Sequence, residues 1–285
     1  MQGKIGLILN LQRPGIKNFL KKFIHWARGQ RLSFVLFPDV GSLIKVPEIS
    51  PNVDRFLKDL KLVITVGGDG TLLQTVRLIG RQRIPILGVN FGRLGFLTSL
   101  TEKEFFKNFE MIKRGQYQIE KRMMLKVQIL RKNRFRETFF VLNDVVIELD
   151  AQSKLGRFKA YLDNEFLNDY RANGLIISTP TGSTAFSLAV GGPIVVPDVD
   201  ALIVAPICAH SLSERPMIFS GHKVLRVTND REDYRYTVSV DGKSDCKLEF
   251  QDSVFVSKAP FETRLIQFKG SSFFELLRTK LNWGI

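Results

Sequence analysis

Cysteine is scarce in this chain of 285 residues, where Cys208 and Cys246 are the two present. Two cysteines cannot build the disulfide framework of a small secreted domain, and they suit a reducing compartment. Cys208 and His210 form a Cys-x-His pair, but a zinc site usually needs four well-spaced ligands. We therefore expect no metal ion held by protein side chains alone.

Long hydrophobic runs are also missing. The apolar run from Ile5 to Leu9 is too short for a signal peptide. The longest uncharged stretch, residues 172–197, contains Pro180, Pro193 and Pro197 and several glycines, which disfavours a membrane helix. We expect a cytoplasmic protein that does not bind membranes.

Acidic residues are too few to balance the basic ones. The chain has 42 Lys and Arg against 28 Asp and Glu, a formal net charge of +14. The basic residues are scattered, and no zinc finger, helix-turn-helix or aromatic RNA-binding signature accompanies them, so we expect no nucleic-acid partner. Attraction for nucleotides that carry several negative charges explains the excess equally well. Four of the basic residues fit the exposed tip of a hairpin: Arg131, Lys132, Arg134 and Arg136.

The most informative stretch runs from Leu62 to Thr71. Leu62–Val66 predicts a buried strand, and the three glycines in Gly67-Gly68-Asp69-Gly70 break it. Thr71 and Gln74 match a capping box, which predicts a helix that begins at Thr71 and ends at Gly80. The stretch therefore predicts a strand, a glycine turn and a helix.

The glycine turn suits a phosphate group. Gly67, Gly68 and Gly70 allow backbone N–H groups to approach an anion, and the start of a helix adds partial positive charge. A carboxylate would not help to hold a phosphate, so Asp69 suggests work on a proton or a metal ion. Taken alone, the stretch is equally consistent with a turn whose residues are there for steric reasons. It matches neither the Gly-x-x-x-x-Gly-Lys-Ser/Thr loop nor the Gly-x-Gly-x-x-Gly fingerprint.

The patterning divides the chain into an α/β part and a β part. Strands and helices alternate up to about residue 100, which predicts a Rossmann-like parallel α/β domain with ligands at the carboxyl ends of its strands. The expected elements are strands at 4–10, 31–39, 62–66 and 85–90 and helices at 14–28, 54–60 and 71–80. Two glycine turns, Gly67–Thr71 and Asn90–Leu97, should then face the same crevice.

A period of about two begins at Gln116 and predicts a C-terminal antiparallel β-sandwich-like domain. The expected strands are 126–130, 138–147, 157–162, 201–207, 224–227, 234–240, 247–250 and 253–256. We expect an N-terminal domain of residues 1–100 to which a last helix within 268–285 returns, and a C-terminal domain of residues 101–267. A helix at 102–115 should connect the two.

Five motifs in order resemble those of the NAD kinase family. The first, Gly67-Gly68-Asp69-Gly70-Thr71, is shared with lipid kinases and, less closely, with phosphofructokinases. The other four are more specific to NAD kinases: Asn90–Leu97 (NFGRLGFL), Asn143–Ile147 (NDVVI), Gly174–Ile194 (from GLIISTPTGSTAFSL to GGPI) and Pro206–Pro216 (PICAHSLSERP).

The resemblance implies that ATP, or another phosphate donor, phosphorylates the 2′-hydroxyl of the adenosine ribose of NAD, with Mg²⁺ as cofactor. Asp69 would accept the proton, and Gly67, Gly68, Gly70 and Thr71 would bind the donor phosphates. By the same resemblance, the NAD-binding residues would be Asp69, Gly70, Asn143, Asp144, Lys154, Arg171, Asn173, Thr184, Ala185, Phe186, Ser187, Leu188, Ala189 and Lys243. The family resemblance also implies a homodimer or homotetramer.

Four of these positions depart from the family pattern. Asp144 stands where Glu is usual, Asn173 where Asp is usual, and Phe186 where Tyr is usual; Lys243 replaces a polar neutral residue. We expect these changes to shift the KM for NAD and to leave activity in place. Two other functions stay open at this point: a lipid kinase, which would share the first motif only, and a dinucleotide sensor without catalytic activity.

Overall fold

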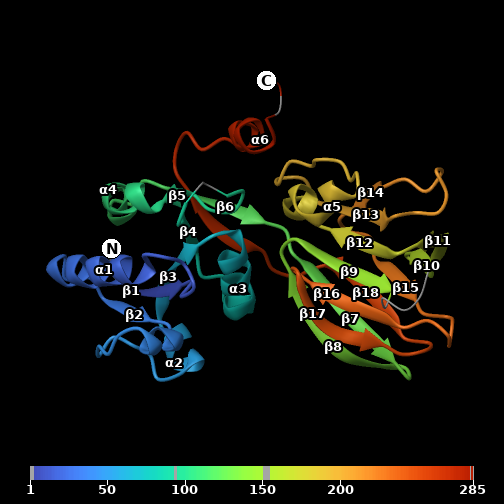
Figure 1. Cartoon of the computed structure of the whole chain (residues 1–285), viewed down its shortest axis with the longest axis horizontal. Helices are drawn as coiled ribbons and strands as arrows, with labels where there is room; N and C mark the ends of the chain where they lie inside the picture. Colours follow the sequence, from blue (N-terminus) through green and yellow to red (C-terminus); the bar gives the residue numbers. More distant parts are fainter. Residues whose placement is uncertain (1–2, 93–94, 150–154, 283, 285) are drawn as a thin grey trace. The chain divides into compact units, whose positions relative to one another are not determined.

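The computed structural model describes residues 3–92, 95–149, 155–282 and 284. Contacts divide the chain into a first unit, Met1–Lys121 with Thr263–Ile285, and a second unit, Arg122–Glu262 (Figure 1). The first unit thus extends beyond the expected limit at residue 100. Helix α4 (Glu102–Lys113), expected as a connector, buries Phe105 and Phe109 in the core of the first unit.

A seven-stranded sheet forms the centre of the first unit. Its order is β2-β1-β3-β4-β19-β6, with β5 paired to β4, and β1–β2, β1–β3, β3–β4, β4–β5 and β4–β19 are parallel. The strands are β1 (Lys4–Leu9), β2 (Phe34–Leu36), β3 (Leu60–Gly67), β4 (Ile86–Asn90), β5 (Leu100–Thr101), β6 (Gln118–Arg122) and β19 (Thr263–Gln267). The predicted parallel α/β arrangement is confirmed.

Helices cover both faces of this sheet. Alternate residues of β3 point to opposite faces: Ile64 and Val66 join the core beneath α1, whereas Thr65 donates a hydrogen bond to Thr75 of α3 at 2.8 Å. This explains why β3 is buried along nearly its whole length. The helical segments are α1 (Ile16–Gly29), η1 (Pro38–Ser42), α2 (Val53–Leu57), α3 (Asp69–Ile79), η2 (Gly80–Gln82), α4 and α6 (Phe273–Leu281).

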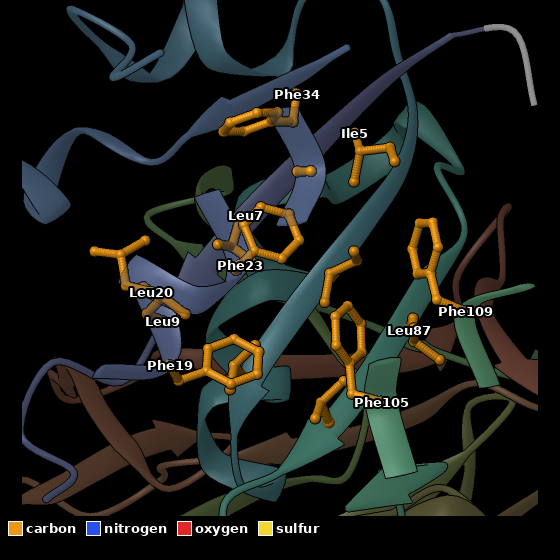
Figure 2. Packing of buried hydrophobic residues seen from close by; sticks show 14 of the residues in the cluster. Ile5, Leu7, Leu9, Phe19, Leu20, Phe23, Phe34, Leu87, Phe105 and Phe109 are labelled. Carbon is orange, nitrogen blue, oxygen red and sulfur yellow. The ribbon is translucent and has the colours of Figure 1, made fainter. Parts of the chain in front are cut away.

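Aromatic side chains from α1 and α4 cluster in the core of the first unit. Phe19 and Phe23 of α1 contact Phe105 of α4, with ring centroids 5.7 and 6.2 Å apart. Trp26 packs edge-on against Phe109 at 4.8 Å. Figure 2 shows the phenylalanine side chains gathered with the aliphatic residues of β1 and β4. The helices α1 and α4 therefore share one face of the sheet.

Two predictions in the first unit were wrong in detail. Helix α3 begins at Asp69, not at Thr71, and Gly68 is its N-cap residue without any side-chain hydrogen bond. The Thr71 side chain instead fills the space beside Gly67, where an added Cβ would come within 2.3 Å of Thr71 Oγ1. The capping box therefore does not form there. The expected strand 31–39 is shorter, because Pro38 begins a 3-10 turn.

Two six-stranded sheets make up the second unit. One has the order β11-β10-β15-β18-β7-β8 and the other β14-β13-β12-β9-β16-β17, with the described pairs antiparallel. The strands are β7 (Leu125–Arg131), β8 (Arg134–Val141), β9 (Asp144–Leu149), β10 (Gly156–Leu162), β11 (Glu165–Ala172), β12 (Gly174–Ser178), β13 (Ala201–Ile207), β14 (Met217–Ser220), β15 (Leu225–Thr228), β16 (Tyr236–Val240), β17 (Lys243–Leu248) and β18 (Ser253–Lys258).

The predicted antiparallel β domain is confirmed, with one correction. The stretch 138–147 is not one strand, because the chain leaves β8 after Val141 and enters β9, in the other sheet, at Asp144. The predicted hairpin tip is confirmed: Lys132 and Asn133, between β7 and β8, both have positive φ. Short helical turns follow β12, namely η3 (Thr181–Thr184) and α5 (Phe186–Ala189).

No helix among the described residues is long and apolar enough to cross a bilayer.

The aromatic core of the first unit gives a direct test of its packing. Phe105 is fully buried against five aromatic rings, so Phe105→Ala should lower the free energy of unfolding by about 3–5 kcal/mol. Phe274, which is 52% exposed, provides the control, and Phe274→Ala should cost less than about 1 kcal/mol. Urea unfolding followed by tryptophan fluorescence measures both. Equal losses in the two variants would contradict the packing described here.

Candidate active site

The glycine turn after β3 leaves backbone donors open at the start of α3. Gly68 caps the helix without a side chain, and the Thr71 amide turns back to the Gly68 carbonyl at 3.0 Å. The amides of Asp69 and Gly70, in the first helical turn, have no intrahelical acceptor. Gly70 is exposed, and nothing lies within 4 Å of the place where its Cβ would be. A phosphate oxygen suits these donors.

The Asp69 side chain joins this turn to the second glycine turn. Its Oδ2 accepts the amide N–H of Phe96 at 2.9 Å, and its Oδ1 accepts that of Leu97 at 3.2 Å. The two glycine turns therefore lie side by side at one edge of the sheet. Arg93 and Leu94 of the second motif lie outside the described residues.

Gly95 makes this contact possible. A Cβ at Gly95 would come within 2.0 Å of Asp69 Oδ1, so no other residue fits without moving the carboxylate. The Gly95 amide donates to Thr98 Oγ1 at 2.9 Å, and that hydroxyl also accepts from Asn90 Nδ2 at 3.3 Å. The loop that holds Asp69 is therefore itself fixed by hydrogen bonds.

The second unit brings Asn143 and Asp144 against the segment that follows β12. The Asn143 carbonyl accepts from the Thr179 amide at 2.9 Å and from Ser178 Oγ at 3.1 Å. The Leu142 carbonyl accepts from Thr179 Oγ1 at 2.6 Å. Gly182 packs so closely that an added Cβ would lie 2.2 Å from the Asn143 carbonyl oxygen. Sequence reasoning did not identify Thr179 as the residue that links these two segments.

Several hydroxyls of the uncharged segment support its backbone. Ser183 is buried, and its Oγ bonds both the amide and the carbonyl of Val195. Ser187 is also buried, and its Oγ has no hydrogen-bond partner among the described residues. Thr184, Ala185 and Leu188 are half-buried, while Phe186 and Ala189 are exposed. The segment therefore presents an uncharged surface, and beneath that surface lies the buried Ser187 hydroxyl without a partner among the described residues.

Asp144 carries the most perturbed carboxyl group of the second unit. The pKa of Asp144 is raised from 3.8 to about 7, mainly by burial and further by repulsion from Asp241, while a hydrogen bond from the Phe186 amide opposes the increase. At neutral pH the carboxyl is thus present in both protonation states. Asp144 can donate a hydrogen bond as well as accept one.

The remaining predicted residues are spread over the second unit. Arg171 and Asn173 are exposed at the end of β11 and just after it, and Lys243 is exposed at the start of β17. The Arg171 backbone anchors the segment 208–216, since its carbonyl accepts from the His210 amide at 2.8 Å and its amide donates to Glu214 at 3.3 Å. Lys154 lies outside the described residues.

No group of three or more His, Cys, Asp and Glu side chains that could hold a metal ion occurs within residues 3–92, 95–149, 155–282 and 284.

The raised pKa of Asp144 predicts a pH-dependent stability. The folded protein binds this proton more tightly than the unfolded chain, so the free energy of unfolding should fall as pH rises from about 4 to 7, by up to about 4 kcal/mol. Asp144→Asn should remove this part of the decline. Urea unfolding of both proteins across that range measures it, and an identical pH slope in the variant would rule the assignment out.

Comparisons with known proteins cover nearly the whole chain. Residues 5–117 match the family model of the ATP-NAD kinase N-terminal domain, and residues 142–268 match that of the ATP-NAD kinase C-terminal domain. The NAD kinase of Geotalea daltonii is 36% identical over 281 residues, which span 99% of each chain.

Two solved structures have the same fold. Yeast NADH kinase complexed with NADH superposes with a TM-score of 0.90 at 25% identity, covering 99% of this chain and 88% of that one. The NAD kinase from Archaeoglobus fulgidus in complex with ATP gives 0.74 at 21% identity and covers 98% of both chains. The two family models and the 36% identity to the Geotalea daltonii NAD kinase show that the chain belongs to the NAD kinase family.

Proposed function

We propose that this protein is an NAD kinase that transfers a phosphoryl group from ATP to the 2′-hydroxyl of the adenosine ribose of NAD, giving NADP. The observation that carries the proposal is the Asp69 carboxylate at the start of α3, fixed by two amides of the second glycine turn. The matches to NAD kinase models in both halves of the chain support the choice of substrate.

The distribution of charge supports a phosphate donor on the first unit. The residues of the first unit include 24 Lys and Arg and 10 Asp and Glu, a net charge of +14, whereas those of the second unit include 18 of each. The whole net charge of the chain thus belongs to the first unit. Such a field attracts a triphosphate. The open amides at the start of α3 would bind its phosphates, and Gly67, Gly68, Gly70 and Thr71 would form the turn that presents these amides.

Asp69 would act as the proton acceptor. A ribose hydroxyl is a weak nucleophile at neutral pH, and phosphoryl transfer depends mainly on aligning that hydroxyl with the phosphorus and on neutralising charge. The two amide hydrogen bonds hold each oxygen of Asp69 in a defined direction and leave further lone pairs for the hydroxyl proton.

The second unit would bind the dinucleotide. Asn143, Asp144 and Thr184–Ala189 offer amide, carboxyl and backbone groups without fixed positive charge, which suits ribose, adenine and a neutral nicotinamide. Arg171, Asn173, Lys154 and Lys243 complete the proposed binding residues.

A divalent cation would enter with the donor. Mg²⁺ keeps most of its shell as water and phosphate oxygens, so it needs no dedicated protein cage. The described residues, which lack a cluster of metal-ligating side chains, are compatible with this mode of binding. When bound, Mg²⁺ would neutralise charge on the donor phosphates.

Two other functions, a lipid kinase and a dinucleotide sensor without catalytic activity, are compared with this proposal. A lipid kinase would share only the first motif, and the match of residues 142–268 to the NAD kinase C-terminal model argues against it. A sensor without catalytic activity would bind NAD but form no NADP, so a turnover assay distinguishes it from a kinase.

Two further proposals concern the protein in the cell. Cys208 and Cys246 are both free thiols, which supports a cytoplasmic location. The edge strand β14 exposes Met217 and Ile218, and the nearby Leu212 is 85% exposed, which supports a homodimer or homotetramer that covers these side chains. Light scattering tests the assembly, and a monomer at micromolar concentration would contradict it.

The first experiment is a turnover assay with ATP, Mg²⁺ and NAD in which NADP is detected by an NADP-specific dehydrogenase. The wild-type protein should form NADP, and Asp69→Asn should keep the fold and lose ~10²–10⁴-fold in kcat, because the base is removed. Glu262→Gln, in which no proposed site residue changes, serves as the control. Near-normal kcat in Asp69→Asn would refute the proposed role of Asp69, and NAD binding without NADP formation by the wild type would favour the sensor.

A further inference from the structure

A second carboxylate, Asp241, lies beneath the Asn143–Asp144 segment. Its Oδ1 accepts the Asn143 amide at 2.7 Å, and its Oδ2 accepts the Leu142 amide at 3.1 Å. The Asp241 amide in turn donates to the Asp144 carbonyl at 3.0 Å. One residue therefore makes three hydrogen bonds to three consecutive residues.

These hydrogen bonds stabilise the segment in which the chain passes from one sheet to the other. Leu142 and Asn143 lie between β8 of one sheet and β9 of the other, where the amides lose their regular strand partners. Asp241 and Gly242 form the two-residue turn between β16 and β17, with positive φ of 47° and 73°. The turn thus places a carboxylate where two amides need an acceptor.

The same carboxylate faces a buried acid. Asp144 is 4% exposed. Three groups among the described residues face it: the Asp241 carboxylate from the β16–β17 turn, the Phe186 amide from α5, and the uncharged Ser178 of β12, the residue opposite Asp144 in the sheet. Burial is the larger cause of the raised pKa of Asp144, and Asp241 adds to it by repulsion.

We propose that Asp241 is a positioning residue of the dinucleotide site, whose carboxylate fixes the Leu142–Asn143 backbone and thereby the placement of Asn143 and Asp144. This inference rests on the proposed function, because it assumes that Asn143 and Asp144 bind NAD. Asp241 acts through these two residues and need not touch the substrate. A change at Asp241 should therefore alter the KM for NAD and leave the rate of phosphoryl transfer, which depends on the first unit, nearly unchanged.

The test is Asp241→Asn. An amide oxygen accepts only one of the two N–H groups and carries no charge, so the backbone should loosen and repulsion on Asp144 should disappear. We expect the KM for NAD to rise about tenfold, with kcat within about threefold of the wild type. The titration of the Asp144 carboxyl, followed by ¹³C NMR and assigned with Asp144→Asn, should move to lower pH, and so should the inflection of KM against pH.

Asp252→Asn is the matched control. Asp252 is 1% exposed, accepts the Glu249 amide at 2.7 Å and pairs with Arg131, but it is not one of the groups that act on Asp144. It should change neither the KM for NAD nor the Asp144 titration. Asp241→Glu keeps the charge and alters the reach, so the Asp144 titration should stay near that of the wild type while KM rises. This variant decides the question if Asp241→Asn does not fold.

The possible results separate the two claims. A raised KM together with a lowered Asp144 titration in Asp241→Asn supports the inference. If the wild type forms NADP and folded Asp241→Asn has the wild-type KM and titration, the inference fails and the proposed function stands. If the wild type neither binds NAD nor forms NADP, the proposed function fails and the inference falls with it.

Discussion

The rest of the catalytic site depends on one contact, in which the Asp69 carboxylate joins two glycine turns. Its two hydrogen bonds, to Phe96 and Leu97, connect the start of α3 to the loop after β4, two segments that are neighbours because β3 and β4 are paired in parallel. The contact requires glycine at position 95, where a Cβ would overlap the carboxylate. The chemistry of the site therefore depends on the sheet order, since only adjacent parallel strands deliver both turns to one edge.

The two units contribute different chemistry. The first unit carries the whole net charge and a helix start with open amides, which suit a polyanionic phosphate donor. The second unit is neutral overall and presents hydroxyls, amides and a carboxyl group of raised pKa, which suit a dinucleotide read by its ribose and base edges. The family to which the chain belongs uses one substrate of each kind, and the charge of each unit fits that division.

The sequence was informative wherever a local pattern decided the structure. The apolar run Leu62–Val66, the glycines after it and the change to a period of two near Gln116 predicted the parallel sheet, the turn and the β-rich unit. The sequence was uninformative where the structure depends on side-chain contacts that no local pattern encodes. The Thr71 capping box did not form because the Thr71 side chain packs beside Gly67. The break at 142–143 went unnoticed because its amides bond to Asp241, almost a hundred residues away. The Asp241-Gly242 pair predicts a hairpin turn, but it does not reveal which amides the aspartate carboxylate accepts.

The most direct measurement is a double-mutant cycle in kcat with Asp69→Asn, Gly95→Ala and the double variant. A side chain at position 95 should displace the Asp69 carboxylate, so Gly95→Ala alone should reduce kcat by ~10²-fold or more. In the Asp69→Asn background the same change should have almost no further effect, since the group that it displaces no longer accepts a proton. If the two losses instead multiply, Gly95 acts independently of Asp69, and the central contact does not have the role given to it here.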